Sequence, residues 1–291
     1  MSEKDDSVLP AKSEAAQSDS SQKGSVVDMM LGKSSEKVID SDTMIQETQK
    51  RIWRSLKKGI EYDATVDRSD AYLRKHVHEK QNMVVMYVDL VGSTDITLTL
   101  PEEKVAIIIS SFAQEMAFAV NHHDGFVLKF VGDAVIGYFI HSSSLIAADN
   151  AVSCAKSMIR IIDEGINPIL NQYDYPDLFV KIGVDFGNNM IVRYGSDAEK
   201  SHVDLIGPAM NIAAKIQGKA GPQEILIGED VYNRIHPTVQ KEFSKKIWNK
   251  DEWKYHSRET GELYPVYYHT KDRKSTRLNS SHLVISYAVF C

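Results

Sequence analysis

Two aspartates stand at turns that follow apolar, strand-like segments. Asp89 closes the run MVVMYVDL at 83–90, and Gly92 behind it permits a tight turn. Asp133 lies in a second turn, and Lys129, four residues earlier on a strand, is expected on the same face as Asp133. The plain alternative is a pair of ordinary turn aspartates and a solvated lysine at a sheet edge. If the two turns meet at one edge of a central sheet, the paired carboxylates make a hard-oxygen site for Mg²⁺ or Mn²⁺.

A third segment, DLIGPAMNIAAK at 204–215, predicts a helix that begins after a Gly-Pro turn. Asn211 and Lys215 are four residues apart, so both side chains project from one face of that helix. Asp204 precedes the turn. The alternative interpretation is an amphipathic helix with Asp204 as a loop cap. The alanines of the segment indicate that one face of the helix is packed closely.

Apolar periodicity predicts the elements that must position these residues. Helices are expected at 43–62, 69–79, 101–122, 145–170 and 208–217, and strands at 83–90, 126–130, 135–140, 178–186, 190–193, 224–227 and 265–269. The strands at 178–186 and 190–193 are expected to form a hairpin around Gly187-Asn188-Asn189. The order is β-α-β-β-α-β. It predicts a ferredoxin-like, split βαβ domain of the α/β (α+β) class, with a central, mostly antiparallel sheet and flanking helices.

Composition limits the class of protein. The chain has 291 residues, 43% of them hydrophobic, and a formal net charge of -6, so it can form a core but has no electrostatic footprint for nucleic acid or an anionic membrane. Its two cysteines exclude a disulfide framework and a zinc ribbon. No apolar run is long enough to span a bilayer, and the first residues do not have the layout of a signal peptide. We expect a cytoplasmic protein.

The three segments, taken in order, resemble the catalytic domain of class III nucleotide cyclases, the adenylate/guanylate cyclase family. The resemblance rests on VDLVGST, KFVGDAVIGYF and DLIGPAMNIAAK and runs from about Met83 to His269. It implies an adenylate cyclase of intracellular signalling, which converts ATP to 3′,5′-cyclic AMP and pyrophosphate. In that family the 3′-hydroxyl attacks the α-phosphate with the help of two divalent ions, Mg²⁺ or Mn²⁺.

The resemblance also assigns roles to residues. Asp89 and Asp133 match the metal-binding aspartates, and Leu90 matches the residue whose backbone carbonyl touches metal. Lys129 and Asp204 match the pair that reads the base, and Asn211 matches the residue that orients the ribose. Lys215 stands at the position of the transition-state residue. Lys254 is the nearest candidate for the phosphate-binding lysine. The family has arginine at position 215, and its Lys-Gly step is missing at Lys254. Lys with Asp accompanies ATP in the family, whereas guanylate cyclases usually carry Glu and Cys.

The family builds each site across a two-fold homodimer interface. Metal aspartates come from one subunit and base and ribose residues from the other, so one chain that carries both sets implies a homodimer. The alternatives are a nucleotide-binding regulatory module of weak activity and a guanylate cyclase. A diguanylate cyclase lacks support because its Gly-Gly-Asp/Glu-Glu-Phe signature is absent. His122 and His123 are adjacent and point apart on a helix, so we interpret them as surface residues.

Four regions are expected along the chain. Residues 1–42 are polar, have no aromatic side chain and predict a disordered tail. Residues 43–79 form a helical segment that either packs on its own domain or serves as a dimerising or signalling helix. The catalytic domain covers 80–271. Residues 272–291 are interpreted as a non-native tail, because KSTRLNSSHLVISYAVFC resembles a translated sequencing adapter. The sequence does not identify an upstream regulator.

Overall fold

The computed structural model describes residues 41–59, 66–249, 251–257 and 260–270, so nearly all of the predicted N-terminal tail and of the predicted non-native C-terminal tail lies outside it. The helices are α2 (Ser41–Lys58), α3 (Asp67–Lys75), α4 (Ser93–Thr99), α5 (Glu102–His122), α6 (Ser144–Arg160), the π-helix η1 (Ile161–Ile166), α7 (Asn167–Leu170), the 3₁₀ helix η2 (Asn171–Tyr173), α8 (Pro208–Gln217), α9 (Glu229–Tyr232) and α10 (Pro237–Gln240). The strands are β1 (Lys80–Val91), β2 (Phe126–Val131), β3 (Ala134–Phe139), β4 (Phe179–Tyr194), β5 (His202–Ile206), β6 (Glu224–Gly228), β7 (Phe243–Lys245) and β8 (Val266–His269). Within these ranges, no helix is both long and apolar enough to cross a membrane.

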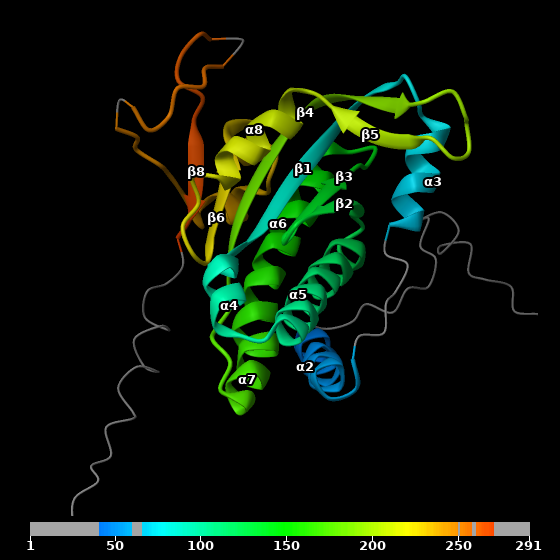
Figure 1. The fold of residues 1–291 in the computed structure, drawn as a ribbon. Coiled ribbons are helices and arrows are strands. Elements are labelled where there is room, and N and C mark those ends of the chain that lie inside the picture. Colours follow the sequence, from blue (N-terminus) through cyan, green and yellow to red (C-terminus); the bar gives the residue numbers. More distant parts are fainter. Residues whose placement is uncertain (1–40, 60–65, 250, 258–259, 271–291) are drawn as a thin grey trace, which may run out of the picture. The chain divides into compact units, whose positions relative to one another are not determined.

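One sheet organises the domain, and its strands run in the order β2-β3-β1-β4-β6-β8-β7, with β5 paired to β4 (Figure 1). The first four strands pair antiparallel in the spatial order 2-3-1-4, which is the split βαβ arrangement that the sequence predicts. β6 then joins β4 in parallel. The predicted fold class is therefore confirmed.

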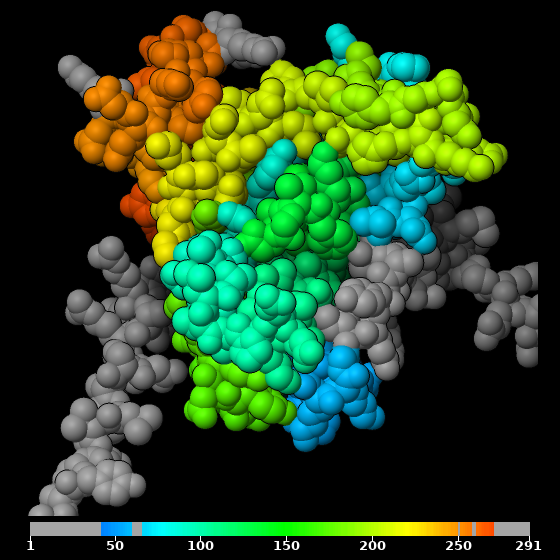
Figure 2. Space-filling model, in the orientation of Figure 1, coloured from blue at the N-terminus to red at the C-terminus, as the bar shows by residue number. Residues whose placement is uncertain are grey.

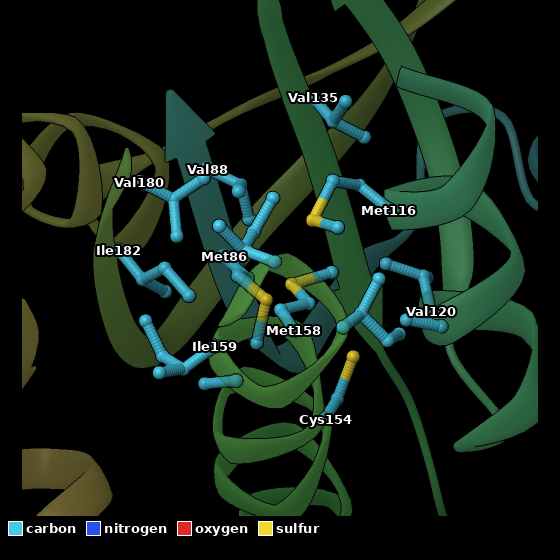
Figure 3. Packing of buried hydrophobic residues seen from close by; sticks show 14 of the residues in the cluster. Met86, Val88, Met116, Val120, Val135, Cys154, Met158, Ile159, Val180 and Ile182 are labelled. Atoms are coloured by element: carbon cyan, nitrogen blue, oxygen red, sulfur yellow. The ribbon is translucent and has the colours of Figure 1, made fainter. Parts of the chain in front are cut away.

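Strand β1 is buried on both faces over most of its length, because helices cover each side of the sheet. Val84, Met86 and Val88 belong to the core that α5 and α6 complete. Met83 and Val85 alternate with them and pack with α3 and α8 on the other face. In Figure 3, Met86 and Val88 meet side chains of β4, α5 and α6, with Met158 and Cys154 contributed by α6. This double burial fixes where β1 ends and hence where Asp89 lies.

The predicted hairpin at 187–189 is wrong, because β4 runs through these residues without a break. Gly187, Asn188 and Asn189 lie instead beside the start of α8. Asn189 is buried, and its side-chain oxygen accepts a hydrogen bond from the backbone N–H of Met210, 3.3 Å away. A Cβ at Gly207 would lie 2.3 Å from that same oxygen, so only glycine lets the chain pass there. The Gly-Asn-Asn run therefore seats the start of α8, and the true partner of the second half of β4 is β5.

Helix α2 packs on its own domain, against α5 and η1. Glu115 of α5 is 2% exposed and accepts hydrogen bonds from Thr48 at 2.7 Å and from Arg51 at 2.6 and 2.7 Å. Gly165 of η1 leaves room for Thr48, whose Cγ2 would lie 2.8 Å from a Cβ at that position. A dimerising or signalling role for this segment stays a prediction.

A buried carboxyl lies at the opposite side of the sheet from α2. Asp185 of β4 is 3% exposed and accepts a hydrogen bond from the Tyr264 hydroxyl at 2.7 Å. Burial, the largest cause, and the nearby charge of Asp230 raise the pKa of Asp185 to about 8, although the hydrogen bond from Tyr264 opposes the shift. The carboxyl is therefore held largely in its neutral form at pH 7.

Candidate active site

The carboxyl end of β1 presents Asp89 at the half-exposed face of the sheet. Its register partner on β4 is Lys181, whose Nζ lies 2.9 Å from Asp89 Oδ2. Gln217, the last residue of α8, donates from Nε2 to the same oxygen at 3.0 Å. The side chain of Asp89 is 23% exposed, so solvent and a ligand can reach it.

Asp133 lies in the two-residue turn between β2 and β3, after Gly132, whose φ of 61° suits glycine. β3 pairs with β1 so that Val135 faces Val88, and the turn therefore lies beside the end of β1. The end of β1 that carries Asp89 and the turn that carries Asp133 therefore lie at the same end of the sheet, and a shared metal site stays a prediction. Leu90 follows Asp89 in β1; its side chain is buried in the core, and its backbone remains in the strand.

This donor set suits a metal that arrives with a nucleotide. Among the described residues, no group of three or more His, Cys, Asp or Glu side chains forms a self-sufficient metal cage. Mg²⁺ is commonly bound by one or two carboxylates together with substrate phosphates, and carboxylate and carbonyl oxygens are the ligands it prefers. Asp89, Asp133 and the Leu90 carbonyl supply ligands of that kind.

Lys129 and Asp204 form an ion pair between β2 and β5, although 75 residues separate them in the chain. Asp204 is only 14% exposed, and its other oxygen accepts from the backbone N–H of Leu205 at 2.9 Å. His202 Nε2 lies 3.8 Å from Asp204. Burial first, and then the charge of Asp204, raise the pKa of Tyr87 on β1, which places this phenol near the pair. Because Asp133 belongs to the turn, the strand-parity argument does not relate it to Lys129.

Helix α8 covers the sheet with its apolar side, burying Ala209, Ala213 and Ile216. Asn211 and Lys215 are exposed on the other side, as their spacing predicts. Figure 2 shows the yellow segment that contains α8 on the same face of the molecule as the green β2–β3 hairpin. The helix thus presents an amide and an ammonium group beside the strands that carry the carboxylates.

Lys254 belongs to a segment that packs against α8, since Trp253 before it shares a buried apolar cluster with Ile216. It is an exposed residue in the stretch between β7 and β8, next to Trp253, which is buried and donates to the backbone oxygen of Tyr264 at 2.8 Å. Among the described contacts, none joins Lys254 to another predicted site residue.

Sequence reasoning missed four neighbours of the predicted groups: Lys181, Gln217, Tyr87 and His202. A lone lysine within the apolar strand LFVKIGVDF was a usable signal for Lys181, since a charge is seldom placed there without a partner. Tyr87 and His202 lie two residues before Asp89 and Asp204 on the same strands, so strand parity was a usable signal for both. Gln217 is brought to the site only by the seating of α8.

The family model of the adenylate and guanylate cyclase catalytic domain matches residues 76–266, and the chain belongs to this family. A cytidylate cyclase from Escherichia coli is 29% identical over 182 residues, which is 60% of this chain and 40% of that protein. A uridylate cyclase from Rhodovulum sp. is 27% identical over 177 residues, 58% of this chain and 72% of that protein. The crystal structure of the guanylyl cyclase Cya2 covers 66% of this chain and 93% of its own, with a TM-score of 0.56 and 19% identity.

These similarities define a class III cyclase domain with the fold of known cyclases. The chain spans about two fifths of the length of the first curated relatives that it matches. The relatives and structures named above differ in the base of their nucleotide, so membership of the family leaves the base to be argued from the site.

Proposed function

We propose that this domain is an adenylate cyclase, which closes ATP to 3′,5′-cyclic AMP and releases pyrophosphate. The observation that carries the proposal is the partly buried ion pair of Lys129 with Asp204. Adenine presents an amino donor beside a ring-nitrogen acceptor. A carboxylate can accept from the former and an ammonium can donate to the latter. Guanine and uracil reverse this pattern at the corresponding edge, and the mismatch would leave buried polar groups unpaired.

Cytosine is the second candidate base, because its amino group and ring nitrogen present the same donor and acceptor order as adenine. The relative named cytidylate cyclase favours this candidate. The Lys129–Asp204 pair therefore selects amino bases, and the size of the pocket must choose between a purine and a pyrimidine.

In the reaction, a bond forms between O3′ and the α-phosphorus while the bond from that phosphorus to the bridging oxygen of pyrophosphate breaks. The hydroxyl proton leaves to solvent or a basic oxygen. Divalent ions held by Asp89 and Asp133, with the Leu90 carbonyl, would supply charge neutralisation and acidify the hydroxyl. Asn211 would hold the ribose for in-line attack. Lys215 would place a fixed positive charge near the phosphoryl oxygens, where negative charge builds.

Lys181 has a proposed role in binding the triphosphate. Its ammonium group pairs with Asp89 Oδ2 at 2.9 Å. When the carboxylate is engaged by a cation, this lysine is left beside the triphosphate and can bind its oxygens. Lys254 stays a second candidate for that role, because it is exposed and Trp253 before it packs with Ile216 of α8.

A complete site is proposed to need two copies of the chain. Asp89 contacts Lys181 and Gln217, whereas Lys129 contacts Asp204, and Asn211 and Lys215 extend from the exposed side of α8. These groups form two half-sites within one chain. In a two-fold homodimer, each half-site of one subunit would meet the complementary half-site of the other, which would give two complete sites.

The experiment that tests the function is a product assay of the purified chain with ATP, CTP, GTP and UTP in turn, in Mg²⁺ and in Mn²⁺. We expect cyclic AMP as the main product. Cyclic CMP would favour the second candidate, and cyclic GMP or cyclic UMP would overturn the base assignment. Binding of ATP without any cyclic product would support a regulatory module in place of an enzyme.

The companion variant Lys129→Glu with Asp204→Cys should shift the preference toward GTP, because it replaces the donor by an acceptor and removes the carboxylate. A matched exchange of an exposed ion pair, Lys50→Glu with Glu47→Lys, lies on α2 away from the site and should leave the preference unchanged. An unchanged preference in the Lys129 and Asp204 variant would contradict the proposed base contact.

A further inference from the structure

The end of α8 touches the predicted metal site of its own chain. Gln217 donates from Nε2 to Asp89 Oδ2 at 3.0 Å, and Lys181 reaches the same oxygen at 2.9 Å. One donor comes from a helix and the other from the neighbouring strand. Asp89 is therefore held from two directions on a single oxygen, even though its side chain is 23% exposed.

The position of Gln217 is fixed by its backbone. A Cβ built on Gly183 of β4 would lie 2.2 Å from the backbone N of Gln217 and 2.5 Å from its Cα, so the helix end rests directly on the strand. Ile216 is fully buried beside it and holds the same turn. The backbone from which the Gln217 side chain extends is thus held close to β4, within reach of Asp89.

The neutral amide matters chemically. A carboxylate that binds a metal is usually hydrogen-bonded by a neighbouring group as well, and this bond fixes its orientation before the metal binds. Gln217 can donate to Asp89 whether or not a cation is present. Lys181, by contrast, carries a positive charge that a nearby cation repels, so its hold on Asp89 weakens when a metal binds.

We propose that Gln217 is a positioning residue for Asp89, and that it makes the seating of α8 a determinant of metal affinity. This inference rests on the proposed function, because it assigns Asp89 to the metal. It also links the two half-sites of one chain, since α8 carries Asn211 and Lys215 on its exposed side and Gln217 at its end.

The test uses Gln217→Met, which keeps the length of the side chain and removes the donor. Because the carboxylates need phosphate oxygens to complete a metal site, Mn²⁺ binding to the full chain is measured with a saturating concentration of 3′-deoxy-ATP, which carries the phosphates but has no 3′-hydroxyl to react. The water-proton relaxation rate reports the protein-bound ion, and Asp89→Ala is the reference that lacks the site. We expect the dissociation constant for Mn²⁺ to rise about 10- to 100-fold, the usual effect of removing such a partner. The Mn²⁺ concentration that gives half-maximal activity should rise in parallel, with a smaller change in the KM for nucleotide.

The matched control is Gln240→Met, which also removes one side-chain amide, here the 2.7 Å bond to the Tyr232 carbonyl. It should keep wild-type Mn²⁺ affinity. If Gln217→Met does not fold, Gln217→Asn shortens the reach by one methylene and is expected to weaken Mn²⁺ binding in the same direction. Unchanged Mn²⁺ affinity in folded Gln217 variants of an active enzyme would overturn this inference alone. A wild-type chain that neither cyclises a nucleotide nor loses Mn²⁺ binding in Asp89→Ala would overturn the proposed function and the inference with it.

Discussion

In the proposed site, Lys215 would offer the α-phosphate one compact charge, where an arginine would offer a planar fork. The position is exposed and shares the outer side of α8 with Asn211, so the longer guanidinium fits without repacking the core. Arginine can bind two phosphate oxygens at once, whereas lysine cannot fix their direction. Lysine keeps the positive charge at this position but lacks the planar donor geometry of arginine.

We predict that Lys215→Arg raises kcat with little change in KM, because only interactions that strengthen in the transition state do so. Lys215→Ala should lower kcat by about 10²- to 10³-fold, the effect of losing one stabilising group. Steady-state kinetics of the three chains measures both values. The assignment fails if arginine has no effect and alanine is harmless, since Lys215 would then be an ordinary surface residue.

Asp185 predicts a pH dependence of stability. Its pKa is raised in the folded chain from 3.8 to about 8, so the folded state binds a proton that the unfolded state releases. A raised pKa contributes stability that is fully present below the unfolded value and is lost as the pH rises through the folded value. The free energy of unfolding should therefore fall between pH 4 and about 8 on account of this group.

The measurement compares wild type with Asp185→Asn, which keeps an oxygen to accept from Tyr264 but carries no charge. Urea unfolding at several pH values between 4 and 9 should show that the free energy of unfolding of the variant rises relative to that of wild type as the pH rises. A constant difference in the free energy of unfolding across this range would contradict the raised pKa.

The positions of single residues were largely readable from the sequence, whereas their partners were not, and the chemical roles of these residues stay predictions. Turns after apolar strands identified Asp89 and Asp133, and helical spacing placed Asn211 and Lys215 on one face, as found. Lys181 and Gln217 meet Asp89 only through the register of β1 with β4 and the seating of α8. Long-range register is set by the whole sheet, so a local pattern cannot supply it.

At the scale of elements, α8 depends on a glycine that lies outside it. Gly183 of β4 lets the backbone of Gln217 approach, and an added Cβ there would overlap two backbone atoms of the helix. Backbone cannot move aside as a flexible side chain can. The strand and the helix end therefore form one packed unit that supports the site.

Gly183→Ala is expected to lower the free energy of unfolding by about 1–3 kcal/mol, the usual effect of overpacking. It should also weaken Mn²⁺ binding, because it lifts Gln217 away from Asp89. The control is Gly218→Ala, one residue beyond α8, where a Cβ would meet its nearest atom at 3.5 Å and φ is -63°. That change should be neutral or stabilising by about 0.4–1 kcal/mol. Equal stability of the two variants in urea unfolding would show that the contact at Gly183 is not close.

Most of the elements were predicted, but α4, β5 and β7 were missed and one predicted hairpin was wrong. Helix α8 was expected at 208–217 and begins and ends there, because proline at its start and glycine after its end are strong local signals. The hairpin at 187–189 was wrong for the converse reason. Glycine and asparagine usually mark turns, but here they let a helix cross a continuous strand, and only the tertiary packing of Asn189 and Gly207 shows it.

At the scale of the molecule, the split βαβ order was predictable, since it depends on the sequence of elements rather than on their packing. The strands β5 and β7 were harder to foresee, because they have only five and three residues, too few to show a clear apolar alternation. The completeness of the site is proposed to be a property of the assembly. Two half-sites in each chain would become two active sites if a second copy supplied the missing half.

The most direct test of this account mixes two inactive variants. Asp89→Ala should abolish activity through the metal site, and Asn211→Ala should lower it strongly because the ribose is no longer held. After subunit exchange, about half of the dimers are mixed, and each mixed dimer has one site with both changes and one site with neither. Activity should therefore return to about a quarter of the wild-type rate per subunit if the two sites are independent. No recovery, with exchange shown by a mass-tagged control, would mean that both residues act within one chain and would contradict the two-chain site.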